Sequence, residues 1–122
     1  MKKTFYIAGP MRGHKGYNYD AFFEAEYDLN QLDIGAENPA SVPLLDGFDP
    51  DVDEFTHYDL LKVFPNCIAM LAKSQGILML DGFENSAGAM SELYVAVNLF
   101  MLPVFKLVDG ELIKINKNDI VF

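Results

Sequence analysis

Two glycine-containing segments, far apart in the sequence, carry the side chains that could do chemistry. The first is "GPMRGHKG", residues 9–16, which holds Arg12, the only arginine in the chain. The second is "DGFENSAG", residues 81–88, which is followed by Glu92. Glycine lets backbone N–H groups approach a ligand closely, and an arginine can bind a phosphate through two hydrogen bonds. A carboxylate such as Glu92 can act as nucleophile or base on an electrophilic sugar carbon.

Both segments lead into predicted helices, whose N-termini favour anions. We therefore expect the two segments to bind a substrate that carries a phosphate group. The expected binding residues are Gly9, Pro10, Met11, Arg12, Gly13, Phe83, Asn85, Ser86 and Gly88. Simpler interpretations stay open: a solvated surface for Arg12, a helix N-cap for Ser86 and an exposed helical position for Glu92. Tyr6, at the end of the preceding strand, could hydrogen-bond the Glu92 carboxylate and hold its rotamer.

Length and composition restrict the class of protein. The chain has 122 residues, of which 51% are hydrophobic, and this suits one domain spanning residues 1–122. A single cysteine rules out an internal disulfide and favours a reducing compartment. No apolar run approaches the roughly 18–20 residues of a membrane span. We expect a cytoplasmic protein without a membrane partner.

The charge and the motifs argue against several partners. A net charge of −9 disfavours binding along a nucleic-acid backbone. His14 and His57 are isolated, and no CxxC or HExxH motif appears, so we expect no metal. The phosphate-binding motif GxxxxGK[ST] and the dinucleotide motif GxGxxG are both missing, so no cofactor is expected.

The order of predicted elements alternates between strands and helices. Expected strands cover residues 3–8, a short stretch after 33–36, 76–80 and 103–108, with a hairpin turn at 109–110. Expected helices run from Asn18 or Asp20 to about Leu32, over 55–63 and 66–73 with a break or kink near Phe64 caused by Pro65, and over 86–99. Residues 41–54 are expected to form a long loop, and the tail 119–122 an edge strand or a crossing to a partner subunit.

This alternation predicts an α/β fold with a mainly parallel sheet, helices on both faces and a C-terminal β-hairpin. In such sheets, ligands bind outside the carboxyl ends of the strands, where the strand order reverses. The segments 9–16 and 81–88 follow two of the predicted strands. We therefore expect them to lie side by side.

The motif pair "YIAGPMRG" and "NSAGAMSE" resembles the nucleoside 2-deoxyribosyltransferase superfamily. More narrowly, it is similar to a small branch with the motif "YIAGPM" that is frequent in phages and bacteria, which would place a phage-encoded copy in the host cytoplasm. The resemblance extends from Lys3 to about Val104 and includes "NPA" at 38–40. It implies a flavodoxin-like three-layer sandwich, assembly into homodimers or larger homo-oligomers, and cleavage of the N-glycosidic bond of a deoxyribonucleoside or its 5′-monophosphate.

The resemblance also implies roles for particular residues. Glu92 matches the nucleophile and Tyr6 the tyrosine that orients it. Ser86 and Arg12 match a phosphate-binding serine and an arginine of the 2′-deoxynucleoside 5′-phosphate N-hydrolases. An aspartate that contacts the sugar 5′-hydroxyl occupies the Ser86 position in the transferases. Serine and arginine favour a 5′-phosphate, because aspartate would repel it.

One part of the family pattern is missing. The enzymes carry an aspartate on the preceding helix that assists the leaving base, and Cys67 lies near that position. Asp59 could replace it only if the chain breaks at Pro65 and folds back, whereas Cys67 is expected to pack in the core. Two further readings therefore stay open. One is a non-catalytic nucleotide-binding protein, and the other is an interaction protein whose acidic loop, Asp46 to Glu54, faces a partner.

Overall fold

The computed structural model describes residues 2–41 and 47–122. These residues form a five-stranded sheet in the order β2-β1-β3-β4-β5. Its strands are β1 Thr4–Ala8, β2 Gly35–Glu37, β3 Gly76–Met79, β4 Val104–Val108 and β5 Glu111–Ile115. The first four strands pair in parallel, and only the β4–β5 hairpin is antiparallel. The sheet and its hairpin confirm the α/β fold expected from the sequence.

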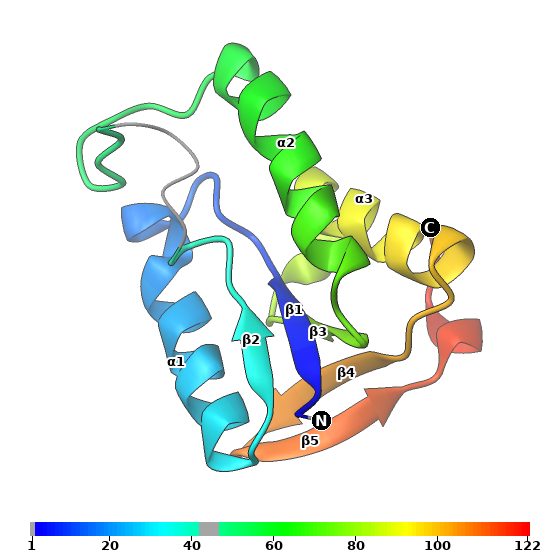
Figure 1. The fold of residues 1–122 in the computed structure, drawn as a ribbon. Helices are drawn as coiled ribbons and strands as arrows, with labels where there is room; N and C mark the ends of the chain where they lie inside the picture. The colour runs from blue at the N-terminus through cyan, green and yellow to red at the C-terminus, as the bar shows by residue number, and fades with distance from the viewer. Residues whose placement is uncertain (1, 42–46) are drawn as a thin grey trace.

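Helices cover both faces of this sheet, as Figure 1 shows. α1, Tyr19–Gln31, lies on one face, whereas α2, His57–Ala72, and α3, Ala87–Tyr94, lie on the other. α3 continues into a π-helical turn, Val95–Leu99. The arrangement is a flavodoxin-like three-layer sandwich. It puts the loops that follow β1 and β3 at the same edge of the sheet.

The alternation of side chains along β1 divides the core into two halves. Phe5 and Ile7 pack with Phe22 and Leu29 of α1 on one face. Tyr6 and Ala8 point to the other face, toward α2 and α3. Strand side chains alternate between faces, so the polar hydroxyl of Tyr6 lies on the α2 and α3 side.

The expected division into two helices near Phe64 is wrong, because α2 runs without interruption from His57 to Ala72 with Pro65 inside it. Proline removes one N–H donor and leaves the carbonyl of Leu61, four residues earlier, without its helical partner. Both Pro65 and Leu61 are exposed. Water can therefore hydrate the freed carbonyl, and the helix keeps its register.

The start of α1 matches the expected residue but not the expected contact. Asn18 occupies the N-cap position with φ 63°, and its side chain makes no capping hydrogen bond. Instead its Nδ2 donates to the carbonyl of Pro10 at 2.9 Å. Asn18 thus fastens the start of α1 to the loop after β1.

The end of the chain does not form the edge strand that was one of the two expectations. Residues Lys117–Asp119 form a 3-10 turn, and Phe122 packs edge-on against Tyr94 with ring centroids 5.3 Å apart. Figure 1 shows the C-terminus beside α3. Of the helices that the structure describes, none combines the length and apolar character that crossing a membrane requires.

Candidate functional site

The loops after β1 and β3 meet at the carboxyl ends of these strands, as expected from the sequence. Ala8 pairs with Met79, and the backbone N–H of Leu80 donates to the Ala8 carbonyl at 2.9 Å. Gly9 lies so close that a Cβ there would stand 2.7 Å from the Cβ of Leu80. The absence of a side chain at Gly9 therefore allows the two loops to approach each other.

Tyr6 and Glu92 form a buried hydrogen-bonded pair beneath these loops. Tyr6 is fully buried, and its hydroxyl donates to Oε2 of Glu92. The Glu92 side chain comes from α3, and the residue is only 9% exposed. The interpretation of Glu92 as an exposed helical glutamate is therefore wrong, and the hydrogen bond expected from Tyr6 is confirmed.

Burial changes the acid–base properties of the pair. It raises the pKa of Glu92 from 4.5 to about 7, although the hydrogen bond from Tyr6 opposes this rise. Burial, together with the nearby carboxylate of Glu92, raises the pKa of Tyr6 well above its usual 10.0. The phenol therefore stays protonated and remains a donor, while Glu92 changes charge near neutral pH. Perturbed carboxyls of this kind are common at functional sites.

Cys67 completes this buried group from the side of α2. It belongs to the same core cluster as Tyr6. Burial and the nearby Glu92 raise the pKa of the Cys67 thiol to about 11, so it stays protonated at neutral pH. A buried, protonated thiol is a poor nucleophile, which agrees with the expectation that Cys67 packs in the core. No carboxylic acid stands at this position.

The start of α3 lies at the same edge of the sheet. Ser86 is its N-cap, and Oγ accepts from the backbone N–H of Ala89 at 3.1 Å, so the N-cap interpretation is confirmed. Gly88 is exposed, and a Cβ there would meet only the Ser86 Oγ at 4.0 Å. Phe83 is partly buried and packs against the core, and Asn85 is exposed. Ser86 and Gly88 thus border open space at a helix N-terminus.

The loop after β1 presents Arg12 at the surface. The guanidinium lies over the ring of Phe55, 4.9 Å from its centroid. Gly13 has φ 80° and open space around its Cα, whereas Pro10 is buried and Met11 packs against the α1 half of the core. Arg12 is therefore exposed, as a solvated arginine would be, but it also stacks on an aromatic side chain.

Phe55 belongs to a contact that the sequence analysis missed. The hydroxyl of Tyr17 donates to the carbonyl of Asp53 at 2.9 Å and accepts from the N–H of Phe55 at 2.8 Å. Its ring also packs against Phe48 at 5.5 Å. Of the long loop expected at 41–54, residues 42–46, including Asp46 of the acidic stretch, lie outside the described residues. The sequence signal for this contact was the pair of aromatic residues, Phe48 and Phe55, that flank the acidic residues 49–54.

Asp59 lies at the solvent-exposed first turn of α2, where it forms a capping box. Its carboxylate accepts from the backbone N–H of Thr56 at 2.9 Å, and its own N–H donates to the Thr56 hydroxyl at 3.3 Å. These hydrogen bonds, that from the backbone above all, lower the pKa of Asp59. Because α2 does not break at Pro65, the condition under which Asp59 was expected to serve as acid is not met.

Asn38, from the "NPA" segment, has a structural role that the sequence analysis did not assign. It is buried, and its Nδ2 donates to the carbonyl of Phe22 and to the carboxylate of Glu26. Its Oδ1 accepts from the N–H of Ala40 at 2.9 Å. Asn38 thus fixes the chain after β2 to α1.

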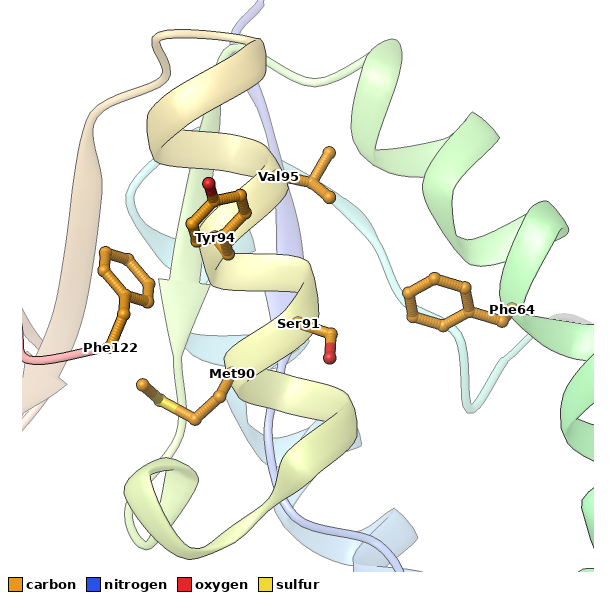
Figure 2. Close-up of a pocket in the computed structure, with 6 residues that line it drawn as sticks. All are labelled: Phe64, Met90, Ser91, Tyr94, Val95 and Phe122. Carbon is orange, nitrogen blue, oxygen red and sulfur yellow. The ribbon is translucent and has the colours of Figure 1, made fainter.

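An apolar groove of about 480 Å³ lies on the outer side of α3, facing α2 and the chain end. Figure 2 shows its lining residues, which are Phe64, Met90, Ser91, Tyr94, Val95 and Phe122. Glu92 is not among them. Over residues 2–41 and 47–122, no three His, Cys, Asp or Glu side chains gather to hold a metal ion.

Comparison with known protein families identifies the family of this chain. The family described as "Domain of unknown function (DUF4406)" matches residues 3–105, which is most of the chain and includes both loops and Glu92. Neither the curated proteins nor the solved structures contain a match. The segment outside the matched region includes β5 and the tail that packs on Tyr94. The chain therefore belongs to the DUF4406 family.

Proposed function

We propose that this protein cleaves or transfers the N-glycosidic bond of a (deoxy)nucleoside 5′-monophosphate, with Glu92 as the nucleophile. The observation that carries the proposal is the buried hydrogen bond between Tyr6, in the middle of β1, and Glu92 of α3. The loop that follows β1 and the start of α3 lie at the carboxyl edge of the sheet, where α/β sheets bind ligands. The resemblance to the nucleoside 2-deoxyribosyltransferases supports the same pair of residues in the same roles.

In the proposed reaction the ionised carboxylate of Glu92 attacks the anomeric carbon of the sugar. A bond forms between that carbon and Oε1, since Oε2 accepts the hydrogen bond from Tyr6. The bond to the base nitrogen breaks, and its electron pair leaves with the base, which takes a proton from solvent. Water, or the nitrogen of an acceptor base, then displaces the carboxylate and completes hydrolysis or transfer.

We assign the binding of the substrate's phosphate group to the loops that follow β1 and β3. Arg12 supplies a positive charge from the loop after β1, and Ser86 and Gly88 lie at the N-terminus of α3. Helix N-termini and arginine both favour a phosphate dianion. The open space around Gly88 supports the approach of such a group.

A non-catalytic nucleotide-binding protein is the second candidate, and one observation favours it. The side chain beside Glu92 and Tyr6 on α2 is the protonated thiol of Cys67, not a carboxylic acid. Without a general acid for the leaving base, the rate falls by about 10²–10⁴-fold. We therefore expect slow cleavage, and faster cleavage of substrates whose base leaves without protonation.

The test is the release of free base from each deoxynucleoside 5′-monophosphate, followed by chromatography. The wild-type protein is compared with Glu92→Ala and with Glu24→Gln, which changes an exposed glutamate of α1 outside both loops and serves as control. The proposal predicts release by the wild type and by Glu24→Gln but not by Glu92→Ala. Tight binding without release identifies the binding protein, and equal release by all three contradicts the role of Glu92.

A further inference from the structure

Arg12 is the one arginine of an acidic chain, and its side chain contacts the residue that directly follows the long loop expected at residues 41–54. Its guanidinium lies 4.9 Å from the centroid of Phe55. Phe55 belongs to residues 48–55, which we call the acidic arm because Asp49, Asp51, Asp53 and Glu54 are part of it. A cation over an aromatic face is attracted to it, so the ring restricts where the guanidinium can lie.

Tyr17 fastens the acidic arm to the loop after β1. Its hydroxyl both donates to the carbonyl of Asp53 and accepts from the N–H of Phe55, at 2.9 and 2.8 Å. The rings of Tyr17, Phe48 and Phe55 pack against one another, with centroids 5.5 to 6.5 Å apart. The ring of Phe55 is therefore held by two aromatic contacts, with Tyr17 and Phe48, and its backbone by the hydrogen bond to the Tyr17 hydroxyl.

The acidic arm is itself held in a defined turn. The N–H of Asp49 donates to the carboxylate of Asp53 at 2.7 Å, and the N–H of Asp53 donates back to the Asp49 carbonyl at 2.8 Å. The carboxylate of Asp49 accepts from the N–H of Asp51 at 2.9 Å. These contacts engage the carboxylates of Asp49 and Asp53 within the arm and fix the backbone that leads to Phe55.

The loop on the other side of this contact has an unusual backbone. Gly16, Tyr17 and Asn18 follow one another with φ of 58°, 51° and 63°. Tyrosine rarely adopts such a value, although asparagine does so more readily, and a residue held there persists only where its surroundings fix it. Here the hydroxyl of Tyr17 and the hydrogen bond from Asn18 to the Pro10 carbonyl provide that restraint.

We propose that Phe55, held by Tyr17, is the positioning residue for Arg12. It keeps the guanidinium in one place for the phosphate of the substrate, so the acidic arm belongs to the binding site although it is itself acidic. This inference rests on the proposed function for the identity of the anion. The placement of Arg12 is testable without any nucleotide.

The first experiment uses nuclear magnetic resonance, for which the single arginine gives one Nε–H signal. Ring currents from Phe55 should move this signal and the Arg12 side-chain protons upfield. Phe55→Leu should return them to the values of a free arginine, and Tyr17→Phe should move them part of the way. Phe23→Leu, which removes an exposed ring on α1, is the control and should change nothing. A wild-type signal already at the free value would overturn the proposal.

The second experiment measures binding of deoxynucleoside 5′-monophosphates by calorimetry in a double-mutant cycle. Phe55→Leu should raise Kd about 2–5-fold, the effect of about 0.5–1 kcal/mol for an exposed cation–π contact. In the Arg12→Ala background the same substitution should have no further effect. An equal loss in both backgrounds would overturn the positioning role.

The two experiments separate the two proposals. If the wild type binds no nucleotide, the proposed function fails, and the titration is repeated with inorganic phosphate as the probe. In that case the magnetic resonance experiment alone tests whether Phe55 positions Arg12. If nucleotides bind but the arginine signal is insensitive to Phe55, the proposed function stands and the positioning role fails.

Discussion

Glu92→Gln is predicted to stabilise the fold at alkaline pH relative to the wild type. Glutamine has nearly the same shape, and its carbonyl oxygen still accepts the hydrogen bond from Tyr6, but it carries no charge at any pH. In the wild type, burial raises the pKa of Glu92 from 4.5 to about 7. The substitution therefore removes one titrating group from the core while it keeps the packing and the hydrogen bond.

The sign follows from where the proton binds. The folded-state pKa lies above the unfolded value, so the native protein holds an extra proton between pH 4.5 and 7. The stability that this proton gives is fully present below the unfolded value and is lost as the pH rises through about 7. At 1.36 kcal/mol per pKa unit, the shift corresponds to about 3 kcal/mol in the limit. About 2–3 kcal/mol of this is expected between pH 5 and pH 8.

The assay is urea unfolding of wild type and Glu92→Gln, followed by far-UV circular dichroism because the chain has no tryptophan. The difference in the free energy of unfolding between the two proteins isolates Glu92 from the other titrating groups. It should move in favour of the variant by about 2–3 kcal/mol as the pH rises from 5 to 8. A difference that stays constant over this range, or that moves in favour of the wild type, would refute the reasoning.

Four further substitutions test other parts of the structure. Tyr6→Phe removes the hydrogen bond that opposes the shift of Glu92, so a carbon-detected titration should give a Glu92 pKa above about 7; an unchanged value would contradict this. Gly9→Ala brings a Cβ to 2.7 Å from Leu80 and should lower the free energy of unfolding by about 1–3 kcal/mol. Gly88→Ala places its Cβ in open space on a helix and should raise the free energy of unfolding by about 1 kcal/mol. A melting temperature that is higher for Gly9→Ala than for Gly88→Ala would contradict both expectations. Arg12→Ala should weaken binding of a monophosphate far more than that of its nucleoside in calorimetry, and equal losses would argue against a phosphate contact.

The sequence predicted the part of the site that depends on regular elements. The alternation of strands and helices determines that the loops after β1 and β3 leave the sheet at one edge, and the contact between Gly9 and Leu80 confirms this. Tyr6 lies on β1, shortly before the loop that follows this strand, and Glu92 lies on α3, shortly after the loop that follows β3. The sequence therefore allowed a hydrogen bond between them, and the family resemblance implied it, whereas spacing alone left an exposed Glu92 open.

The remaining features depend on contacts that spacing does not determine. Whether Pro65 breaks a helix depends on whether water reaches the freed carbonyl, and the exposure of Leu61 is a property of the folded molecule. The contact between Tyr17 and the acidic arm depends on consecutive residues with positive φ, which sequence patterns do not reveal outside glycine. The role of Asn38 likewise depends on a carbonyl and a carboxylate that α1 brings to it.

The most direct test of Glu92 as nucleophile is to look for the sugar attached to it. A 2-fluorinated deoxynucleoside 5′-monophosphate analogue with a weakly basic leaving group needs no general acid, and the fluorine slows the breakdown of a glycosyl ester through its oxocarbenium-like transition state. After incubation and acid quenching, peptide mass spectrometry should find one sugar phosphate, on Glu92, and none in Glu92→Gln. Label on another residue, equal label in both proteins, or no label at all would contradict the account.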